Sequence, residues 1–347
     1  MLRNRNRLWL MLLAVPLVIG AVLALLNGHR PQALPLDHSP MAPIAVSFDD
    51  NLVATNKDGQ IDILEIYDRS RRRSTQFRTS SVPGAWVFLP DNRTLVTVGR
   101  RDSPFEALSS SVQLWDAATQ TDNLDLAQPK RTFGPELAWG NALALSPDTK
   151  TLATGGQRAI LLWDVATGRV TARLAGAGNA PNALTFSRDG KRLAASYMRA
   201  GVNAACWDVP ARKLLWTAQV PPGAGRFDVM SSAISPDAER VVLGSSSGQI
   251  AIFDGATGSL LHQGTLPAGD ASSSVPLDAA RAVAFSPDGK TIVSGGWSEA
   301  AAWNAADASV KHLFKGSGPM VFSPDGNLLA TGAEVNAKNG VILWKTW

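Results

Sequence analysis

Short runs of alternating apolar residues, separated by turn sequences, fill most of the chain beyond residue 40. Residues 282–285 (AVAF) and 291–294 (TIVS) are two such runs, and this alternation predicts β-strands. The Ser-Pro-Asp-Gly sequence between them is typical of a turn, because Pro presets φ, Asp bonds its own backbone and Gly accepts a positive φ. A third run follows, as in residues 160–164 (ILLWD), and an Ala-Thr-Gly turn leads to a fourth. The pattern predicts units of four short antiparallel strands, named a to d in chain order.

The unit recurs seven times, at a period of about 46 residues. Its a–b turn carries an aspartate in every copy: Asp49, Asp91, Asp148, Asp189, Asp237, Asp288 and Asp325. Strand c ends on an aromatic residue in every copy: Tyr67, Trp115, Trp163, Trp207, Phe253, Trp303 and Trp344. A four-stranded unit of this length is typical of a β-propeller blade, which must stack against its neighbours to bury both faces. We therefore expect an all-β, seven-bladed β-propeller of four-stranded antiparallel blades, preceded by one N-terminal transmembrane helix.

These repeats, with SPDG turns followed by a Trp-Asp pair, resemble the bacterial type of the WD-repeat β-propeller family over residues 32–347. The Gly-His pair that precedes strand a in that family is absent from most units, and Leu36-Asp37-His38 is its nearest counterpart. We therefore expect the family's Asp-His-Ser-Trp hydrogen-bond network to be largely missing. The resemblance implies a non-catalytic scaffold that binds a protein partner of unknown identity.

The N-terminal segment predicts a membrane anchor. Residues 8–26 contain no charged side chain and would span about 28 Å as a helix, close to the hydrocarbon thickness of a bilayer. Three arginines precede this segment, which favours a cytoplasmic N-terminus. We assign residues 1–7 to a short basic cytoplasmic tail, 8–26 to a transmembrane signal-anchor, 27–31 to a linker and 32–347 to the propeller. The alternative is a cleaved signal peptide, although the uncharged run is longer than is usual for one.

Closure of the ring sets the expected orientation. The sequence supplies no fourth strand after strand c of the seventh blade, so we expect residues 32–36 to close that blade. The linker then reaches at most about 17 Å, which holds the propeller near the bilayer. The a–b and c–d turns should face the lipid, including a membrane-proximal basic turn with Arg69, Arg71, Arg72 and Arg73. The alternative for these arginines is an ordinary solvated turn. We expect a single-pass membrane protein with an extracytoplasmic propeller, periplasmic in a bacterium.

Charge argues against nucleic acid as a partner. The chain has 33 basic and 29 acidic side chains. Residues 1–30 contain four arginines and no acidic residue, so the rest of the chain has 29 of each and no net charge. A nucleic-acid-binding domain usually shows a basic excess on its folded part.

Catalytic motifs are largely lacking in the sequence. It contains no HExxH motif, and its single cysteine, Cys206, falls in a predicted strand where a buried inert thiol is expected. The turn aspartates lie one to a blade and cannot converge on one ion. We expect no enzyme activity, no cofactor and no metal site. A propeller enzyme, or a sensor that binds a small ligand in the central channel, remains the alternative.

The face opposite the predicted membrane side carries residue types that dominate protein interfaces. The b–c turns would present Arg158, Tyr197, Arg199 and Trp297, the d–a loops Trp139, Arg226 and Phe227, and a long b–c insertion in the second unit Phe105. The alternative is that several of these aromatic residues plug the channel or pack under neighbouring loops.

Overall fold

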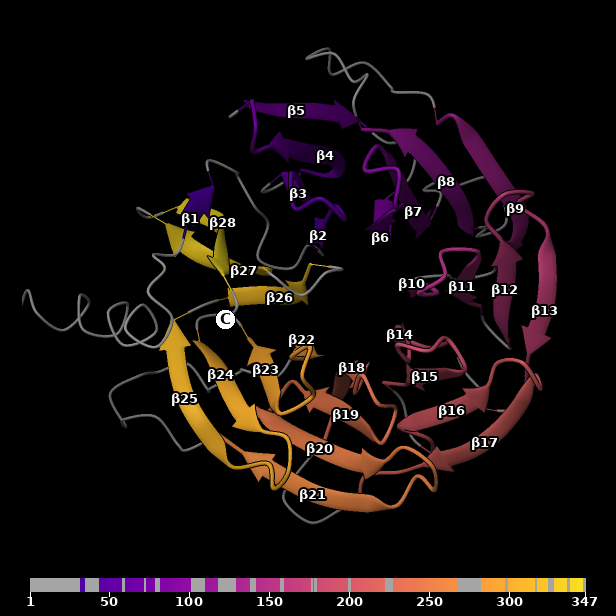
Figure 1. Ribbon diagram of the computed structural model, residues 1–347, viewed down its shortest axis with the longest axis vertical. Coiled ribbons are helices and arrows are strands. Elements are labelled where there is room, and N and C mark those ends of the chain that lie inside the picture. Colours follow the sequence, from indigo (N-terminus) through magenta and orange to yellow (C-terminus); the bar gives the residue numbers. More distant parts are fainter. Residues whose placement is uncertain are drawn as a thin grey trace, which may run out of the picture.

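Seven four-stranded sheets stand around a central axis in the computed structural model (Figure 1). The structure describes residues 32–34, 44–57, 60–71, 73–78, 82–100, 110–117, 129–137, 142–156, 159–175, 177, 180–198, 201–221, 227–266, 282–296, 299–315, 317–323, 328–335 and 338–345. Each sheet is one antiparallel blade, and we number the blades 1 to 7 along the chain. The expectation of an all-β, seven-bladed propeller is confirmed.

Blades 1 to 4 follow the order a, b, c, d from the axis outward. Blade 1 holds β2 (Ala45–Val46), β3 (Leu52–Lys57), β4 (Gln60–Asp68) and β5 (Arg73–Arg78). Blade 2 holds β6 (Val82–Phe88), β7 (Thr94–Arg100), β8 (Ser110–Asp116) and β9 (Arg131–Leu137). Blade 3 holds β10 (Leu143–Leu145), β11 (Thr151–Gly155), β12 (Ile160–Asp164) and β13 (Val170–Leu174). Blade 4 holds β14 (Ala183–Phe186), β15 (Arg192–Ser196), β16 (Ala204–Asp208) and β17 (Lys213–Ala218).

Blades 5 and 6 repeat this order, and blade 7 differs in its outermost strand. Blade 5 holds β18 (Val229–Ile234), β19 (Arg240–Ser245), β20 (Gln249–Asp254) and β21 (Leu260–Thr265). Blade 6 holds β22 (Ala282–Phe285), β23 (Thr291–Gly295), β24 (Glu299–Asn304) and β25 (Val310–Lys315). Blade 7 holds β26 (Ser317–Phe322), β27 (Leu328–Val335), β28 (Lys338–Lys345) and β1 (Gln32–Leu34).

The first strand of the chain closes the ring. β1 runs antiparallel to β28, with Gln32 opposite Leu343 and Leu34 opposite Val341. Leu34 is 3% exposed and packs in a cluster that also contains residues of blades 7 and 1. Residues 32–34 thus take the closing position that the sequence analysis expected of residues 32–36, and residues 35 and 36 lie outside the described residues. Residues 1–31, with the predicted anchor, lie outside the described residues, and no helix in the described part is long and apolar enough to cross a membrane.

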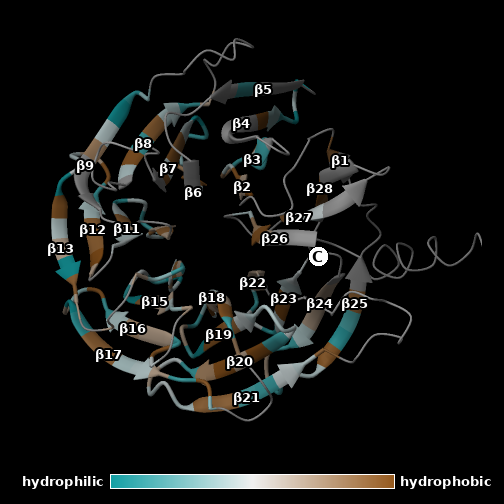
Figure 2. Ribbon diagram, turned by 180° about the vertical axis from the view of Figure 1, so that it is seen from behind, coloured by the Kyte–Doolittle hydropathy of each residue, from teal (hydrophilic) through white to brown (hydrophobic). Residues whose placement is uncertain are grey.

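The core lies between adjacent blades. One cluster, for example, joins Cys206 and Trp216 of blade 4 to Val229, Val241 and Phe253 of blade 5. Middle strands such as β12 and β20 are buried almost throughout, whereas the outer strands β13 and β21 alternate or face solvent (Figure 2). The apolar faces of neighbouring blades therefore cover each other, and this packing holds the ring together.

The strand-c tryptophans retain more of the family's hydrogen-bond network than the sequence analysis expected. In four blades the indole Nε1 donates to a hydroxyl on strand b: Trp115 to Thr97 at 2.9 Å, Trp163 to Thr154 at 2.8 Å, Trp303 to Ser294 at 2.8 Å and Trp344 to Thr331 at 3.0 Å. Trp207 donates instead to the Ala175 carbonyl, at 3.2 Å. The expectation of a largely missing network was thus too broad, because the Trp–hydroxyl half needs no histidine.

The a–b turns are fixed by a serine and an aspartate two residues apart. In blade 3 the Ser146 hydroxyl donates to Asp148 at 2.5 Å and accepts the Thr151 N–H at 2.9 Å. Blades 1, 4, 5 and 6 repeat both bonds. Blade 2 has Leu89 in place of the serine, and there Thr94 donates to Asp91 from both its N–H and its hydroxyl. The aspartates that mark the repeat in the sequence therefore shape turns.

In blades 3 and 5 the c–d turn packs against an aromatic residue on the outer strand of the preceding blade. In blade 5, Gly258 has φ +73°, and a Cβ built on it would lie 2.7 Å from the ring of Trp216 on the outer strand of blade 4. Trp216 also donates from Nε1 to the carbonyl of Gly255 in the same turn, at 3.0 Å. Phe133 of blade 2 packs in the same way against Gly168 of blade 3. At the outer rim, these aromatic residues pack on the glycine turns and connect blade 2 to blade 3 and blade 4 to blade 5.

Candidate binding site

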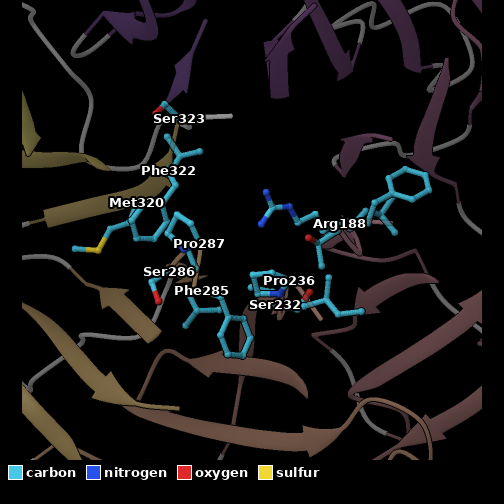
Figure 3. A pocket seen from close by; sticks show the side chains of 17 residues that line it. Arg188, Ser232, Pro236, Phe285, Ser286, Pro287, Met320, Phe322 and Ser323 are labelled. Atoms are coloured by element: carbon cyan, nitrogen blue, oxygen red, sulfur yellow. The ribbon is translucent and has the colours of Figure 1, made fainter. Parts of the chain in front are cut away.

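A cavity of about 400 Å³ occupies the central channel at the end that carries the a–b turns (Figure 3). Its walls are the innermost strands of four consecutive blades, β14, β18, β22 and β26, together with the turns that follow them. Met320 and Phe322 project from β26, and Phe285 comes from β22 (Figure 3). Phe322 is partly exposed, as are the lining residues Phe186 and Val321, whereas Met320 and Phe285 pack mainly between the blades. The accessible wall is thus partly apolar, and a cavity of this size suits a small molecule.

Arg188 is the only charged residue among those that line the cavity, all of which the structure describes. It occupies the second position of the blade 4 turn, where the neighbouring turns have Pro147, Pro236 and Pro287. The turn itself is unaltered, because Ser187 still donates to Asp189 at 2.6 Å and Gly190 keeps a φ of +70°. The substitution therefore changes the side chain at the channel mouth and leaves the local backbone as it is in the other blades.

The guanidinium of Arg188 reaches across the cavity toward the wall formed by β26 (Figure 3). Arg188 is exposed and forms no hydrogen bond or ion pair with any residue that the structure describes. The Ser187 hydroxyl lowers the pKa of the adjacent Asp189 carboxyl by donating a hydrogen bond to it. That aspartate is thus ionised and held by its own turn, so Arg188 remains available to an external anion.

Ser232 adds a polar group to the cavity wall. It lies on β18, is 8% exposed, and its hydroxyl is buried without a hydrogen-bond partner in the described structure. The other wall serines that the structure describes are engaged in turns: Ser286 donates to Asp288 and Ser323 accepts the Leu328 N–H. The Ser232 hydroxyl is buried from solvent, so it contributes to the shape of the wall and not to the surface that a ligand would contact.

Tyr197 does not belong to a partner-facing surface, which corrects the prediction made from the sequence. It is 3% exposed and packs in the cluster between blades 3 and 4. Its N–H donates to the Asn203 carbonyl at 3.0 Å, so it continues the ladder of β15 and β16 and its ring faces inward. Burial raises the pKa of its phenol. Phe227 is partly buried against the cluster of blades 4 and 5 and offers little free surface.

Met198, beside Tyr197 in the same b–c turn, is a large apolar side chain that is 48% exposed. The remaining predicted residues of the partner face lie outside the described residues: Phe105, Trp139, Arg158, Arg199, Arg226 and Trp297. Their role as a binding surface stays a prediction.

The basic turn of blade 1 is less open than its sequence indicates. Arg69 folds back and donates from Nη1 to the Asp50 carbonyl at 2.5 Å, and Arg73 is the first residue of β5 rather than part of the turn. Arg71 is exposed, with its Nε 3.5 Å from the Asp68 carboxylate. Arg72 lies outside the described residues. Of the two arginines of this cluster whose side chains the structure describes, Arg69 and Arg71, Arg71 is the exposed one.

Cys206 is fully buried on β16, as the sequence analysis expected. Burial raises the pKa of its thiol to about 11. A thiol in this state is a poor nucleophile at neutral pH.

Comparison with known proteins places this ring in a family. A family model described as outer membrane protein assembly factor BamB matches residues 106–346, from the b–c insertion of blade 2 to the end of blade 7. The chain belongs to this family. Blade 1, the first two strands of blade 2 and the closing strand β1 precede the matched residues.

Curated relatives support a WD-repeat-like propeller. The chain is 23% identical over 286 residues to the guanine nucleotide-binding protein subunit beta of Solanum tuberosum, covering 78% of this chain and 67% of that protein. It is 29% identical over 146 residues to the transcription factor unc-37 of Caenorhabditis elegans and 28% identical over 186 residues to the periodic tryptophan protein 2 homolog of Schizosaccharomyces pombe. These matches cover 42% and 49% of this chain but only about a fifth of either relative.

The cavity is the feature that the sequence analysis did not specify. A signal for it was present, because Arg188 breaks an otherwise regular Ser-Pro-Asp turn. That signal says where the arginine sits in the repeat, but the cavity itself depends on how far the seven inner strands stand from the axis.

Proposed function

We propose that this protein is a non-catalytic scaffold that holds a protein partner at the end of the ring carrying the b–c and d–a loops. The observation that carries the proposal is the family match over residues 106–346, whose description names an assembly factor. The relative from Solanum tuberosum is described as a subunit, which is also a component of a larger assembly. A closed ring suits this role, because a rigid scaffold presents its loops in fixed positions.

The exposed Met198 supports the choice of face. It stands on a b–c turn whose neighbour Tyr197 is anchored in the core. A flexible, polarizable thioether on a fixed turn is well suited to an apolar contact with a partner. All eight of the predicted partner-face residues fall, by sequence, in b–c turns or d–a loops.

The proposal includes a membrane anchor in residues 8–26 and a propeller outside the cytoplasm, which is the periplasm in a bacterium. Its support is the uncharged run that follows three arginines. The register of β1 also supports it, because Gln32 pairs with Leu343, toward the end of β28 that leads to the c–d side. An anchor that precedes Gln32 would approach the ring from the side of the a–b and c–d turns.

Site-specific photocrosslinking in intact cells tests the scaffold. A photoreactive amino acid at Met198 should capture one discrete envelope protein. The matched control is the same amino acid at Leu261, which is 42% exposed but lies on the outer strand β21. Equal capture of the same protein from both positions, or no capture at Met198, contradicts the proposal.

Fractionation tests the anchor separately. The full chain should sediment with membranes and resist extraction at high pH, and its N-terminus should begin at Met1. Removal of residues 1–31 should release the propeller into the soluble fraction. A mature protein that begins after residue 26 would instead establish the cleaved signal peptide, leaving the scaffold proposal untouched.

A further inference from the structure

We propose that the channel cavity binds a small amphiphilic carboxylate, with its apolar body against β22 and β26 and its carboxylate at Arg188. This site is separate from the proposed partner face. It lies at the a–b turn end of the channel, whereas the b–c and d–a loops lie at the other end. The inference therefore stands or falls independently of the scaffold.

The apolar part of the ligand follows from the walls. Phe186, Val321 and Phe322 line the cavity and are partly exposed, whereas Met320 and Phe285 pack mainly between the blades behind this wall. A volume of about 400 Å³ lies at the lower end of the range for small-molecule pockets. An unbranched or cyclic body of moderate size would displace water from these side chains, and this displacement favours binding.

The charge of the ligand follows from Arg188. The described lining residues contain no aspartate or glutamate, and the guanidinium points into the cavity without a partner among the described residues (Figure 3). A planar guanidinium matches a carboxylate with two parallel hydrogen bonds, and this interaction is strengthened where apolar walls exclude water. An amine would be repelled at this position.

Two features of the wall, its apolar surface and one cation without a partner among the described residues, match the chemistry of one class of ligand. Ser232 also lies on the wall, but its hydroxyl is buried from solvent and contributes to the shape of the wall rather than to ligand contact.

Calorimetric titration with matched probes tests the proposal. Decanoate should bind, whereas decanol, which lacks the charge, and decylammonium, which reverses it, should bind at least about 10-fold more weakly. Arg188→Gln should weaken decanoate binding about 10- to 100-fold and leave decanol unchanged. The control Arg169→Gln removes an exposed arginine from the c–d turn of blade 3 and should have no effect.

Methyl NMR locates the bound probe. With ¹³C-methyl methionine labelling, decanoate should shift the Met320 signal, which reports on the cavity, and leave the exposed Met198 signal in place. Arg188→Pro restores the turn sequence of the neighbouring blades and should fold normally, so it guards against loss of binding through misfolding. Equal binding of decanoate and decanol, unchanged affinity in Arg188→Gln, or a shift at Met198 alone would overturn the proposal.

Discussion

Left-handed backbone recurs at one position in every described a–b turn, and glycine occupies it in only some blades. The residues with positive φ are Asp50, Asn92, Thr149, Gly190, Ala238 and Gly289. A side chain at such a position costs about 1–2 kcal/mol relative to glycine. The ring accepts this cost in several blades because the serine–aspartate bonds hold the turn. At the c–d turns the glycine has a second role, since neighbouring aromatic rings occupy the space of its missing Cβ.

Gly190 and Gly258 have nearly the same positive φ, so substituting each of them separates the cost of the backbone conformation from the cost of filling the space beside an aromatic ring. Gly190→Ala meets only an ordinary contact, at 3.6 Å from Pro147, so it should cost about 1 kcal/mol of unfolding free energy from φ alone. Gly258→Ala brings a Cβ to 2.7 Å from the Trp216 ring and should cost about 2–4 kcal/mol in total. Urea unfolding of both variants gives the difference. Equal losses would show that the blade 4–blade 5 contact yields without cost.

Cys206 should be inert in the native protein. Its pKa is raised to about 11 by burial, so at pH 8 the thiolate fraction falls about 100-fold below that of an ordinary thiol, and access is blocked as well. Ellman's reagent should therefore react only after unfolding in guanidinium, with one thiol per chain. Rapid reaction of the native protein would show that β16 opens readily.

At the scale of elements, four blades share a hydrogen bond from a strand-c tryptophan to a strand-b hydroxyl. Thr154→Val leaves the Trp163 Nε1–H buried without its acceptor and should lower the unfolding free energy by about 1–3 kcal/mol. Thr154→Ser keeps the hydroxyl, as Ser294 does in blade 6, and should lose clearly less. Thermal unfolding by circular dichroism compares the two. A larger loss for the serine variant would assign the effect to packing of the methyl group.

The a–b turns should make stability depend on acid pH. Hydrogen bonds from Ser146 and Ser187 lower the pKa values of Asp148 and Asp189 below 3.8. A carboxyl with a lower pKa when folded stabilises the fold fully above its unfolded pKa and loses this contribution as the pH falls toward the folded value. The urea midpoint should therefore be level between pH 7 and 5 and fall below about pH 4.

The double variant Ser146→Ala/Ser187→Ala tests the cause of that dependence. It should lower the midpoint at pH 7 and flatten the fall below pH 4, because the two pKa values return toward 3.8. Thr217→Ala, on an exposed position of β17, is the control and should leave the pH profile unchanged. An unchanged acid slope in the double variant would assign it to other carboxyls.

The elements were predictable because their determinants are local. The Ser-Pro-Asp turns and the strand-c aromatic residues predict the strand order of each blade. Blade 1 departs from the repeat, with Ser-Phe-Asp at the turn and Tyr67 on strand c, but keeps enough of the pattern to be recognised. Tyr197 was misassigned because an aromatic residue next to a turn was read as exposed, while its backbone continues the β15–β16 ladder. Packing against the neighbouring blade decides whether a ring at the end of a strand faces the core or solvent. A single sequence does not show which blade surface lies beside that ring.

At the scale of the whole molecule, stability depends on the strand that closes the ring. Leu34→Ala should lower the unfolding free energy by about 2–4 kcal/mol, because Leu34 is 3% exposed between blades 7 and 1. Leu215→Ala, at a 39% exposed position on β17, is the control and should change it by less than about 0.5 kcal/mol. Denaturant unfolding measures both. Equal effects would mean that β1 is a dispensable edge.

Closure itself could be inferred from the sequence, and the channel could not. The segment before the first repeat could be expected to close the seventh blade, and β1 pairs with the outer edge of β28 there. The cavity depends on the radius of the ring and on four inner strands from separate repeats, and no local pattern encodes that distance. Six of the eight predicted partner-face residues lie outside the described residues.

The pairing of β1 with β28 also orders events on the ribosome. The two strands are separated by roughly 300 residues, and at about 5–20 residues per second translation takes some 15–60 s to pass from one to the other. Throughout that interval the nascent chain carries a strand whose partner does not yet exist. Premature termination anywhere before β28 therefore yields a polypeptide in which β1 has no partner strand, and the unpaired sheet edge can pair with other chains.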